Sequence, residues 1–324
     1  MTGPELSLVV PVFNEQASIA PFLARVRPVL ERSARSHEIV FVNDGSRDGT
    51  LDLLIAEQRR DDRVRVVDLS RNFGKEAALS AGLDFASGRA VVPIDVDLQD
   101  PPELIADMLQ LWRSGFEMVL AQRAERSVDN WSKRAASNLF YRLANRVSDV
   151  EVPHNVGDFR LMDRKVVEAL ALMPERARFM KGLFAWLGFR QTTIRYAREA
   201  RSAGESKFRI GSLWRLALDG LVSFSTTPLK VWTYLGAVFA LTAFAALCVI
   251  IVRTLVFGVD LPGYASLAAF VLFFSGLNLL GLGVIGEYLA RVFVEVKRRP
   301  LYIVRATAGF DDQQTQTIVL NRRL

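Results

Sequence analysis

The stretch "AVVPIDVDLQDPPELIADMLQLWRSG", residues 90–115, joins a short apolar run, a group of acids and a longer segment that ends at a glycine. The apolar run predicts a buried β-strand over residues 90–96. Residues 102–115 predict a helix, with Asp100 as its N-cap and Glu103 placed for a capping box. A strand followed at once by a helix is the repeating unit of α/β proteins, so this stretch indicates the fold class.

The same unit recurs through the first 110 residues, which predicts a parallel α/β sheet. The expected strands are residues 6–13, 38–43, 64–69, 90–96 and 118–122, and the expected helices are residues 17–35, 51–60, 75–86 and 102–115. Farther along, we expect helices near residues 133–147 and 164–172, and a strand near residues 189–194. No internal repeat is found.

Asp95, Asp97 and Gln99 stand at alternate positions where the strand 90–96 ends. In an extended chain, residues two apart share a face, so we expect all three to point the same way at the carboxyl edge of the sheet. Open α/β sheets bind ligands at that edge. Two carboxylates and an amide oxygen suit Mg²⁺ or Mn²⁺, with a phosphate completing the shell. The alternative is helix capping, a role that Asp100 already fills.

Acids also follow the first two expected strands. Glu15 and Asp44 come at adjacent strand ends, where they can accept hydrogen bonds from a nucleobase and a ribose. The residues 46–49 that follow Asp44 are assigned to turn chemistry. Arg71 and Lys75 lie near an expected helix start, which is a usable phosphate-facing arrangement.

Two long uncharged runs occupy the C-terminal third. Residues 231–252 contain 22 residues without a charge, and residues 261–286 contain 26 more. About 20 apolar residues span a bilayer as a helix, so the runs predict two transmembrane helices, over about 231–252 and 264–286. A pair of buried core helices is the alternative, although such helices usually show a polar stripe. Residues 210–224 alternate apolar and charged residues at helical spacing, which predicts a helix in the membrane interface.

Basic residues flank the two runs and set the expected orientation. Arg209, Arg215 and Lys230 precede the first run, and Arg291 with residues 297–299 follows the second. By the positive-inside rule, both ends of the chain face the cytoplasm. The net charge of +6 fits a protein that lies against anionic lipid or binds phosphorylated ligands. It does not indicate nucleic acid, because no such binding motif accompanies it.

Several smaller features carry no expected chemistry. The single cysteine, Cys248, lies inside an expected span, which excludes disulfides and a cysteine–zinc site. His37 and His154 have no ligand partner in view and are interpreted as structural. "GLGVIG", residues 281–286, spells a dinucleotide fingerprint inside an uncharged run, so close helix packing explains it better. After Arg305 the chain turns polar and is expected to be a loosely ordered tail.

Four of these motifs together resemble the family 2 glycosyltransferases: "PVFNE" (11–15), "VNDGSRDGT" (42–50), "RNFGKEAAL" (71–79) and "DVDLQDPPE" (95–103). More narrowly, they resemble the polyprenyl-phosphate glycosyltransferases, which include dolichol-phosphate mannose synthase and bacterial undecaprenyl-phosphate glucosyltransferases. The resemblance continues through "VGDFRLMDR" (156–164), "RSAGESKF" (201–208) and "GVIGEYLARVFVEVKRRPLY" (283–302). It covers nearly the whole chain to about Arg305, and seven motifs in order make it specific.

The resemblance implies a role for particular residues. Those that bind the nucleotide sugar would be Pro11, Phe13, Glu15, Val42, Asp44, Lys75, Asp95, Val96 and Arg123. The metal and the donor diphosphate would be held by Asp95, Asp97 and Gln99. Arg201 and Lys207 would bind phosphate groups from a mobile loop before the membrane. Asp158 would activate or orient the acceptor, so the expected catalytic set is Asp97, Asp158, Arg201 and Lys207.

The implied architecture is an α/β, Rossmann-like domain of GT-A type over residues 1–209, followed by an interfacial helix over 210–229. Two transmembrane helices within 230–290 and a cytoplasmic segment over 291–324 complete it. Such a chain would sit in the bacterial cytoplasmic membrane as a multi-pass protein with both termini cytoplasmic. A homotetramer is plausible by resemblance.

The implied reaction is inverting transfer of one sugar, by a metal-dependent hexosyltransferase using Mg²⁺ or Mn²⁺, from a nucleotide sugar to undecaprenyl phosphate. UDP-glucose is favoured, because "RNFGKEAAL" and "GEYLARVFVEVKRRP" look most like the bacterial glucosyl group. GDP-mannose, UDP-N-acetylglucosamine and UDP-galactose remain open as donors. A processive polysaccharide synthase is disfavoured, because its Gln-x-x-Arg-Trp motif is missing. A non-catalytic membrane scaffold is disfavoured by the intact Asp95, Asp97 and Gln99 set.

Overall fold

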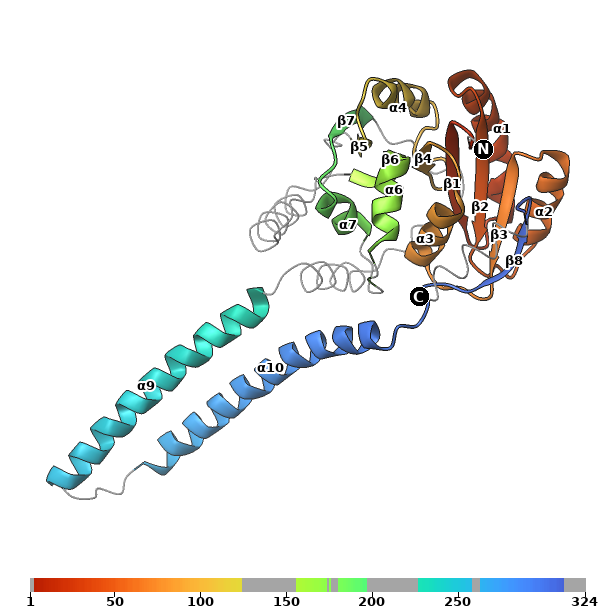
Figure 1. Ribbon diagram of the computed structural model, residues 1–324. Coiled ribbons are helices and arrows are strands. Elements are labelled where there is room, and N and C mark those ends of the chain that lie inside the picture. The colour runs from red at the N-terminus through yellow and green to blue at the C-terminus, as the bar shows by residue number, and fades with distance from the viewer. Residues whose placement is uncertain are drawn as a thin grey trace.

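Eight strands form one mixed sheet among the residues that the computed structural model describes, which are 3–123, 156–173, 175, 180–196, 227–257 and 263–311. The strand order is β7-β5-β6-β4-β1-β2-β3-β8 (Figure 1). The strands are β1 (Leu6–Val12), β2 (His37–Asn43), β3 (Val64–Leu69), β4 (Ala90–Pro93), β5 (Met118–Arg123), β6 (Val156–Asp163), β7 (Gln191–Tyr196) and β8 (Val304–Ala308). The block β4-β1-β2-β3 is parallel throughout, as the N-terminal repeat predicts.

Helices cover both faces of the sheet. The helices of the described residues are α1 (Gln16–Ser33), α2 (Thr50–Arg60), α3 (Lys75–Phe85), α4 (Leu104–Arg113), α6 (Arg164–Ala171), α7 (Met180–Trp186), α9 (Thr227–Phe257) and α10 (Tyr264–Val296). α1, α2 and α4 pack together on one face, and α3 and α6 pack together on the other. The first five expected strands and first four expected helices are confirmed to within a few residues, apart from β4, which ends three residues earlier than expected.

The spacing of apolar side chains explains why these helices dock. α1 buries side chains three and four positions apart, which lie on one side of a helix: Ile19, Phe22, Leu23, Val26, Val29 and Leu30. They join Leu8 and Phe41 of the sheet in one core, where Phe22 and Phe41 meet edge to face with ring centroids 6.0 Å apart. Each such side chain, when fully buried, contributes about 1.5–3 kcal/mol to stability.

A strand from the far end of the chain completes the sheet. β8 pairs antiparallel with the edge strand β3, and Arg305 of β8 donates to Asp68 of β3 at 2.6 Å. Tyr302, just before β8, is 8% exposed and packs in the core cluster under α3. The expectation of a loosely ordered tail after Arg305 is therefore wrong as far as residue 311, and residues 312–324 lie outside the described part. The polar residues of β8 are compatible with a strand, because β8 lies at the edge of the sheet and needs only one buried face.

Two other expectations need correction. Asp100 was expected to cap the helix after β4, but Glu103 holds the N-cap position of α4 and makes no side-chain cap hydrogen bond. Asp100 is instead buried against β5 and β7, where a carboxylate needs a charged or hydrogen-bonding partner. β6, which carries the "VGDFRLMDR" stretch, was not predicted as a strand. Asp163, the last residue of β6, is the N-cap of α6, and its side chain accepts a hydrogen bond from the Lys165 amide.

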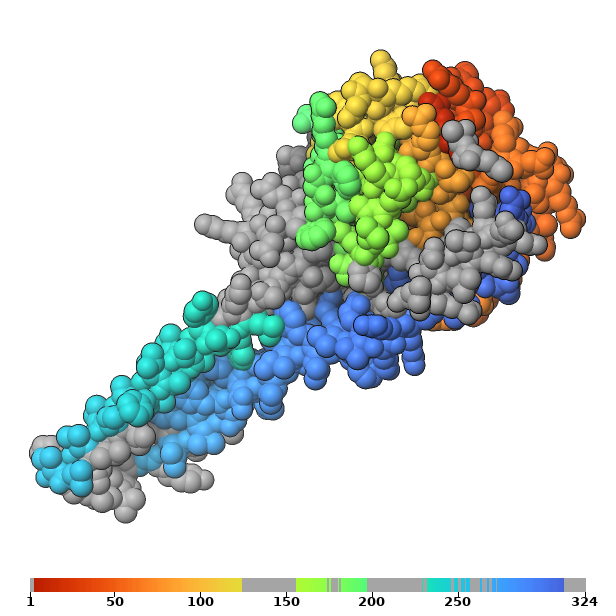
Figure 2. Space-filling view, viewed as in Figure 1, coloured from red at the N-terminus to blue at the C-terminus, as the bar shows by residue number. Residues whose placement is uncertain are grey.

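α9 and α10 form an antiparallel pair that extends away from the sheet domain (Figures 1 and 2). α9 contains the first uncharged run of the sequence, and α10 contains most of the second and continues to Val296. Taken over the residues that the structure describes, no helix combines the length and apolar content needed to cross a bilayer, so the two expected spans are not confirmed. Trp232 of α9 packs so closely on Gly281 of α10 that a Cβ at residue 281 would lie 1.7 Å from the indole nitrogen. That contact supports the packing interpretation of "GLGVIG" at its first glycine. The expected interfacial helix over 210–224 lies outside the described residues.

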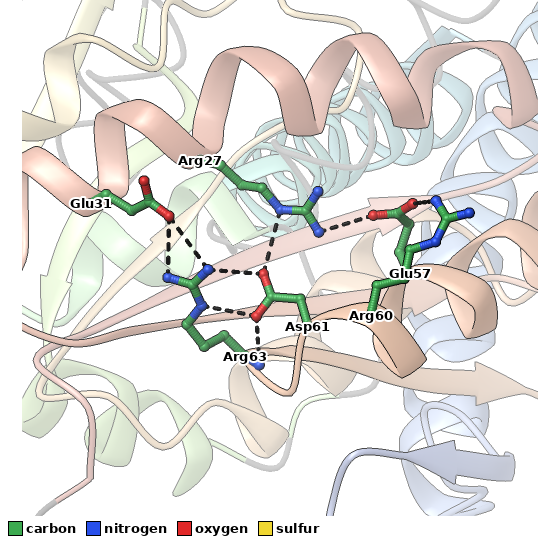
Figure 3. Close-up of polar contacts among 6 residues, drawn as sticks. All are labelled: Arg27, Glu31, Glu57, Arg60, Asp61 and Arg63. Carbon is green, nitrogen blue, oxygen red and sulfur yellow. Dashed lines mark hydrogen bonds and ion pairs between the residues drawn. The ribbon is translucent and has the colours of Figure 1, made fainter.

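Charged side chains tie α1 to α2 and to the start of β3 (Figure 3). Arg27 of α1 lies 2.9 Å from Glu57 of α2 and 3.4 Å from Asp61, which also holds Arg63 at 2.8 Å. Partly exposed pairs of this kind each contribute roughly 0–1 kcal/mol. Because the network lies where α2 ends and β3 begins, it is at the amino edge of the sheet and away from the ligand-binding edge.

Candidate active site

A pocket of about 300 Å³ opens at the carboxyl edge of the parallel block. The ends of β1 and β2, the start of α3 and the turn after β4 all contribute to it. Its lining residues are Pro11, Val12, Phe13, Glu15, Asp44, Asn72, Gly74, Lys75, Ala78, Asp95, Val96 and Asp97. Ligands of open α/β sheets bind at this edge, so the pocket is the candidate active site.

Asp44 forms one side of the pocket and joins β2 to the loop before α3. Its carboxylate accepts from the backbone amides of Phe73 at 2.7 Å and Gly74 at 2.9 Å. Burial raises the pKa of Asp44 above the ordinary carboxyl value, although the two amide bonds act in the opposite direction. The next residue, Gly45, has φ of 66°, and a Cβ there would lie 2.4 Å from the Arg71 carbonyl carbon. Glycine at residue 45 therefore allows the two loops to meet.

Phe13 and Glu15 contribute from the end of β1. The Phe13 ring is 43% exposed at the pocket, so it offers an aromatic face to a ligand. The Glu15 amide donates to the Thr50 hydroxyl at 3.0 Å, and its carboxylate accepts from the Ser18 hydroxyl at 2.6 Å. These bonds anchor the start of α1 beside the pocket. Sequence reasoning grouped Val42 with these residues, but its side chain is buried under α3 and does not line the pocket.

A lysine lies between two carboxylates on the opposite side. Nζ of Lys75, in the first turn of α3, lies 2.7 Å from Asp95 and 2.9 Å from Asp158 of β6. Burial lowers the pKa of Lys75, but the two neighbouring carboxylates raise it, and the net shift is upward. The ammonium therefore stays charged at any physiological pH. This arrangement brings Asp158 to the pocket, although it is not one of the lining residues.

The turn after β4 presents Asp97 to the pocket. Leu98 has φ of 57°, and the Gln99 amide donates to Oδ1 of Asp97 at 3.2 Å. The chain is therefore not extended here, and the expectation that Asp95, Asp97 and Gln99 share one strand face is wrong. Asp95 and Asp97 line the pocket, whereas Gln99 is 7% exposed and does not.

The residues of this turn are nonetheless chemically suited to Mg²⁺ or Mn²⁺. Asp95 and Asp97 supply carboxylate oxygens, and Oε1 of Gln99 is buried without a hydrogen-bond partner among the described residues. That same part of the chain contains no group of three or more His, Cys, Asp or Glu side chains that could hold a metal. A metal here would thus take the two carboxylates and the Gln99 amide oxygen, with ligand oxygens for the rest of its shell, so the metal site stays a prediction.

Arg123 ends β5 near the turn but outside the pocket lining. Its Nε donates to the Tyr196 hydroxyl at 3.2 Å, and its Nη2 lies 3.5 Å from Oδ1 of Asp100. Burial lowers the pKa of Arg123, while Tyr196, Asp100 and Asp95 raise it, and the net shift is upward. Sequence reasoning missed Tyr196 and assigned Asp100 to capping. No local pattern links three residues from three different elements.

The pocket also includes Asn72 and Gly74, which were not predicted. The only sequence signal for them is their place in "RNFG", between Arg71 and Lys75, at a helix start. Gly74 has φ of 97°, which lets its amide turn toward Asp44. Arg201, Lys207 and His154 lie outside the described residues.

An α/β domain with an acid-lined pocket at the carboxyl edge defines a broad class of ligand-binding enzyme domains. Within that class, residues 7–171 match the family described as Glycosyl transferase family 2. The chain therefore belongs to the family 2 glycosyltransferases, and it is an enzyme of that family. The resemblance seen in its motifs is confirmed.

Individual relatives match over nearly the whole chain. An uncharacterized glycosyltransferase of Synechocystis sp. is 50% identical over 307 residues, which cover 95% of this chain and 96% of the relative. The SfII prophage-derived bactoprenol glucosyl transferase of Shigella flexneri is 50% identical over 301 residues, covering 93% and 97%. The prophage bactoprenol glucosyl transferase homolog of Escherichia coli K12 is 48% identical over 301 residues, covering 93% and 98%.

Solved structures are more distant. A glucosyl-3-phosphoglycerate synthase from Mycobacterium tuberculosis, in complex with Mn²⁺, uridine diphosphate and glucosyl-3-phosphoglycerate, has a TM-score of 0.48. It is 20% identical, and the match covers 68% of this chain and 78% of that one. A similarity of this size does not identify a ligand.

Proposed function

We propose that this glycosyltransferase transfers glucose from UDP-glucose to the phosphate of bactoprenol (undecaprenol), with inversion at the anomeric carbon. The observation that carries the proposal is the pocket of acids around Lys75, in a chain about half identical to bactoprenol glucosyl transferases along nearly all its length. The relatives supply the acceptor and the sugar. The pocket supplies a place for a charged donor at the edge of the sheet.

The donor nucleotide would lie along the ends of β1 and β2. Asp44 and Glu15 can accept hydrogen bonds from the ribose and base, and the exposed Phe13 ring offers a stacking surface. The diphosphate would then reach Lys75 and the turn carrying Asp97. This direction places the sugar toward Asp158 on β6, which Lys75 already contacts at 2.9 Å.

The chemical step would need charge compensation more than proton removal. A phosphate acceptor is anionic at neutral pH, so Asp158 would orient the acceptor or sugar rather than act as a strong base. Asp95, Asp97 and Gln99 would hold Mg²⁺ or Mn²⁺, which supplies positive charge against the departing diphosphate when bound. Lys75 would add a second positive charge from the protein. Arg201 and Lys207 would complete the phosphate contacts of donor and acceptor.

The α9–α10 hairpin would hold the enzyme at the membrane, where a polyprenyl phosphate resides. Its full sequence, including residues outside the described set, has uncharged runs of 22 and 26 residues. Large apolar side chains are exposed along both helices, among them Leu241 at 70% and Leu279 at 69%. Exposed apolar surface on this scale indicates a binding partner or lipid. With basic residues at both outer ends, the hairpin would place both termini in the cytoplasm.

A donor panel tests the sugar and the nucleotide. The purified full chain in detergent is heated with Mg²⁺ and, in separate samples, UDP-glucose, UDP-galactose, UDP-N-acetylglucosamine or GDP-mannose. At a fixed concentration, a ligand that binds only the folded state raises the melting temperature more the more tightly it binds. We expect UDP-glucose to give the largest shift. A larger shift with GDP-mannose would overturn the UDP-glucose assignment while leaving the transferase class intact.

A further inference from the structure

Three elements meet around the guanidinium of Arg123. The residue ends β5, its Nε donates to the Tyr196 hydroxyl of β7 at 3.2 Å, and its Nη2 lies 3.5 Å from Asp100 in the turn after β4. The Tyr196 hydroxyl also donates to the same Asp100 oxygen. Tyr196 and Asp100 are therefore hydrogen-bonded to each other, and both contact Arg123.

The two partners of Arg123 are buried more deeply than the arginine itself. The side chain of Asp100 is 5% exposed and Tyr196 is 7% exposed, whereas the Arg123 side chain is 33% exposed. A buried carboxylate without a cation costs several kcal/mol, so Asp100 strongly favours this placement of Arg123. Burial and the bond to Asp100 raise the pKa of Tyr196 to about 12, so its hydroxyl keeps its proton.

A fourth element leaves room for the guanidinium. A Cβ on Gly157 of β6 would lie 3.1 Å from Nη2 of Arg123, which is tighter than an ordinary contact. Gly157 precedes Asp158, and Asp95 is near enough to raise the pKa of Arg123. The arginine is thus held beside the carboxylates of the candidate active site, on the β5 side of Asp95.

We propose that Asp100 and Tyr196 are positioning residues that hold the Arg123 guanidinium ready to bind the diphosphate of the donor. The inference rests on the proposed function, because it takes a nucleoside diphosphate as the ligand. Lys75 from α3 and Arg123 from β5 then supply positive charge from two different elements. An arginine side chain loses much conformational entropy when it becomes ordered. If Asp100 and Tyr196 hold Arg123 in place before the ligand binds, that entropy loss no longer opposes binding of the diphosphate.

The experiment measures binding of uridine, UMP and UDP to the full chain in detergent by calorimetry, with Mg²⁺ present. Tyr196→Phe removes one partner of Arg123 and keeps the ring packing. We expect it to weaken UDP binding about 5- to 20-fold and to leave uridine binding within about twofold. Asp100→Asn is a second variant with the same expected pattern. Tyr302→Phe is the matched control, because its hydroxyl bonds Asp84 at 2.7 Å and makes no contact with Arg123.

A double-mutant cycle shows whether Tyr196 acts through Arg123. In an Arg123→Gln background, Tyr196→Phe should change UDP binding by less than about twofold, because the group it positions is gone. Equal losses for uridine and UDP, or a full effect of Tyr196→Phe without Arg123, would overturn the inference in favour of a merely structural role. If the unmodified chain does not bind UDP, the proposed function fails instead.

Discussion

Nζ of Lys75 lies 2.7 Å from Oδ1 of Asp95, joining the first turn of α3 to the turn after β4. The pair links two strand-to-helix connections that are 20 residues apart in the chain, and its lysine reaches Asp158 as well. Two carboxylates near one another repel, and the ammonium offsets that repulsion in the free enzyme. Under the proposed function, the same lysine would face the phosphate oxygens of the bound donor.

Lys75→Gln should therefore reduce turnover far more than it reduces stability. It removes the positive charge that the proposed function places opposite the diphosphate, and it breaks the ion pairs with Asp95 and Asp158, so we expect kcat to fall about 10²-fold or more. Steady-state transfer kinetics measure this. Lys165→Gln is the matched control, because Lys165 pairs with Glu117 on the surface away from the pocket. Equal effects of the two substitutions would argue against a role for Lys75 in the reaction.

Tyr302 tests whether the segment after α10 is part of the folded domain. Tyr302→Ala removes a buried ring from the core under α3 and should lower the free energy of unfolding by about 3–5 kcal/mol. Tyr302→Phe keeps the ring and removes the hydroxyl that donates to Asp84, so it should cost about 1 kcal/mol. Thermal melts of the full chain in detergent compare the two. A melting temperature unchanged by Tyr302→Ala would show that the segment does not pack on the domain.

His37 gives a pH dependence of known sign. Burial lowers the pKa of His37 below its ordinary value, so the unfolded chain binds a proton more readily than the folded one. Its contribution to stability is complete above the unfolded pKa of about 6.5 and is lost as pH falls through that value toward the folded pKa. We expect the fall in melting temperature between pH 7.5 and 5.5 to be smaller in His37→Gln. An equal fall in melting temperature in the unmodified chain and in His37→Gln would contradict the assignment of this pH dependence to His37.

Cys248, on the exposed surface of α9, reports directly on whether the α9–α10 hairpin lies in a membrane. A water-soluble maleimide reacts with a thiolate, which needs water to form. In inverted membrane vesicles, Cys248 should stay unlabelled until the bilayer is dissolved. Asp62→Cys in a Cys248→Ser background places the thiol on an exposed loop and should label at once. Equal labelling rates in intact vesicles would contradict the membrane placement.

The sheet was predictable where local patterns carry the information. Residues 64–69 form β3 as expected, because a short and mostly apolar segment between polar turns is typical of a strand buried in a parallel sheet. β6 and β8 escaped prediction, since polar and charged residues interrupt both segments, which read VGDFRLMD and VRATA, and leave no continuous apolar run. The chain after Arg305 looked like a polar tail, but β8 continues to Ala308 and pairs with β3.

The residues of the candidate site also divide into those that local sequence patterns predict and those that depend on contacts between distant elements. Asp44, Lys75 and Asp97 were predictable, because parallel strands end at one edge and helices begin there. Asp100 was misread, since the residue before "PPE" resembles a helix cap in sequence and only its contact with Tyr196 shows otherwise. Local patterns report neighbours along the chain, whereas the Arg123 cluster depends on contacts between β5, β7 and the turn after β4.

The most direct test of the proposed function follows glucose itself. The purified full chain is incubated with radiolabelled UDP-glucose, undecaprenyl phosphate and Mg²⁺ or Mn²⁺, and the lipid is extracted and counted. We predict that label enters the lipid, that a chelator abolishes transfer until metal is restored, and that Asp97→Asn loses it while the exposed-acid control Asp62→Asn does not. Transfer that persists in chelator, or no transfer from any nucleotide sugar, would contradict the proposal.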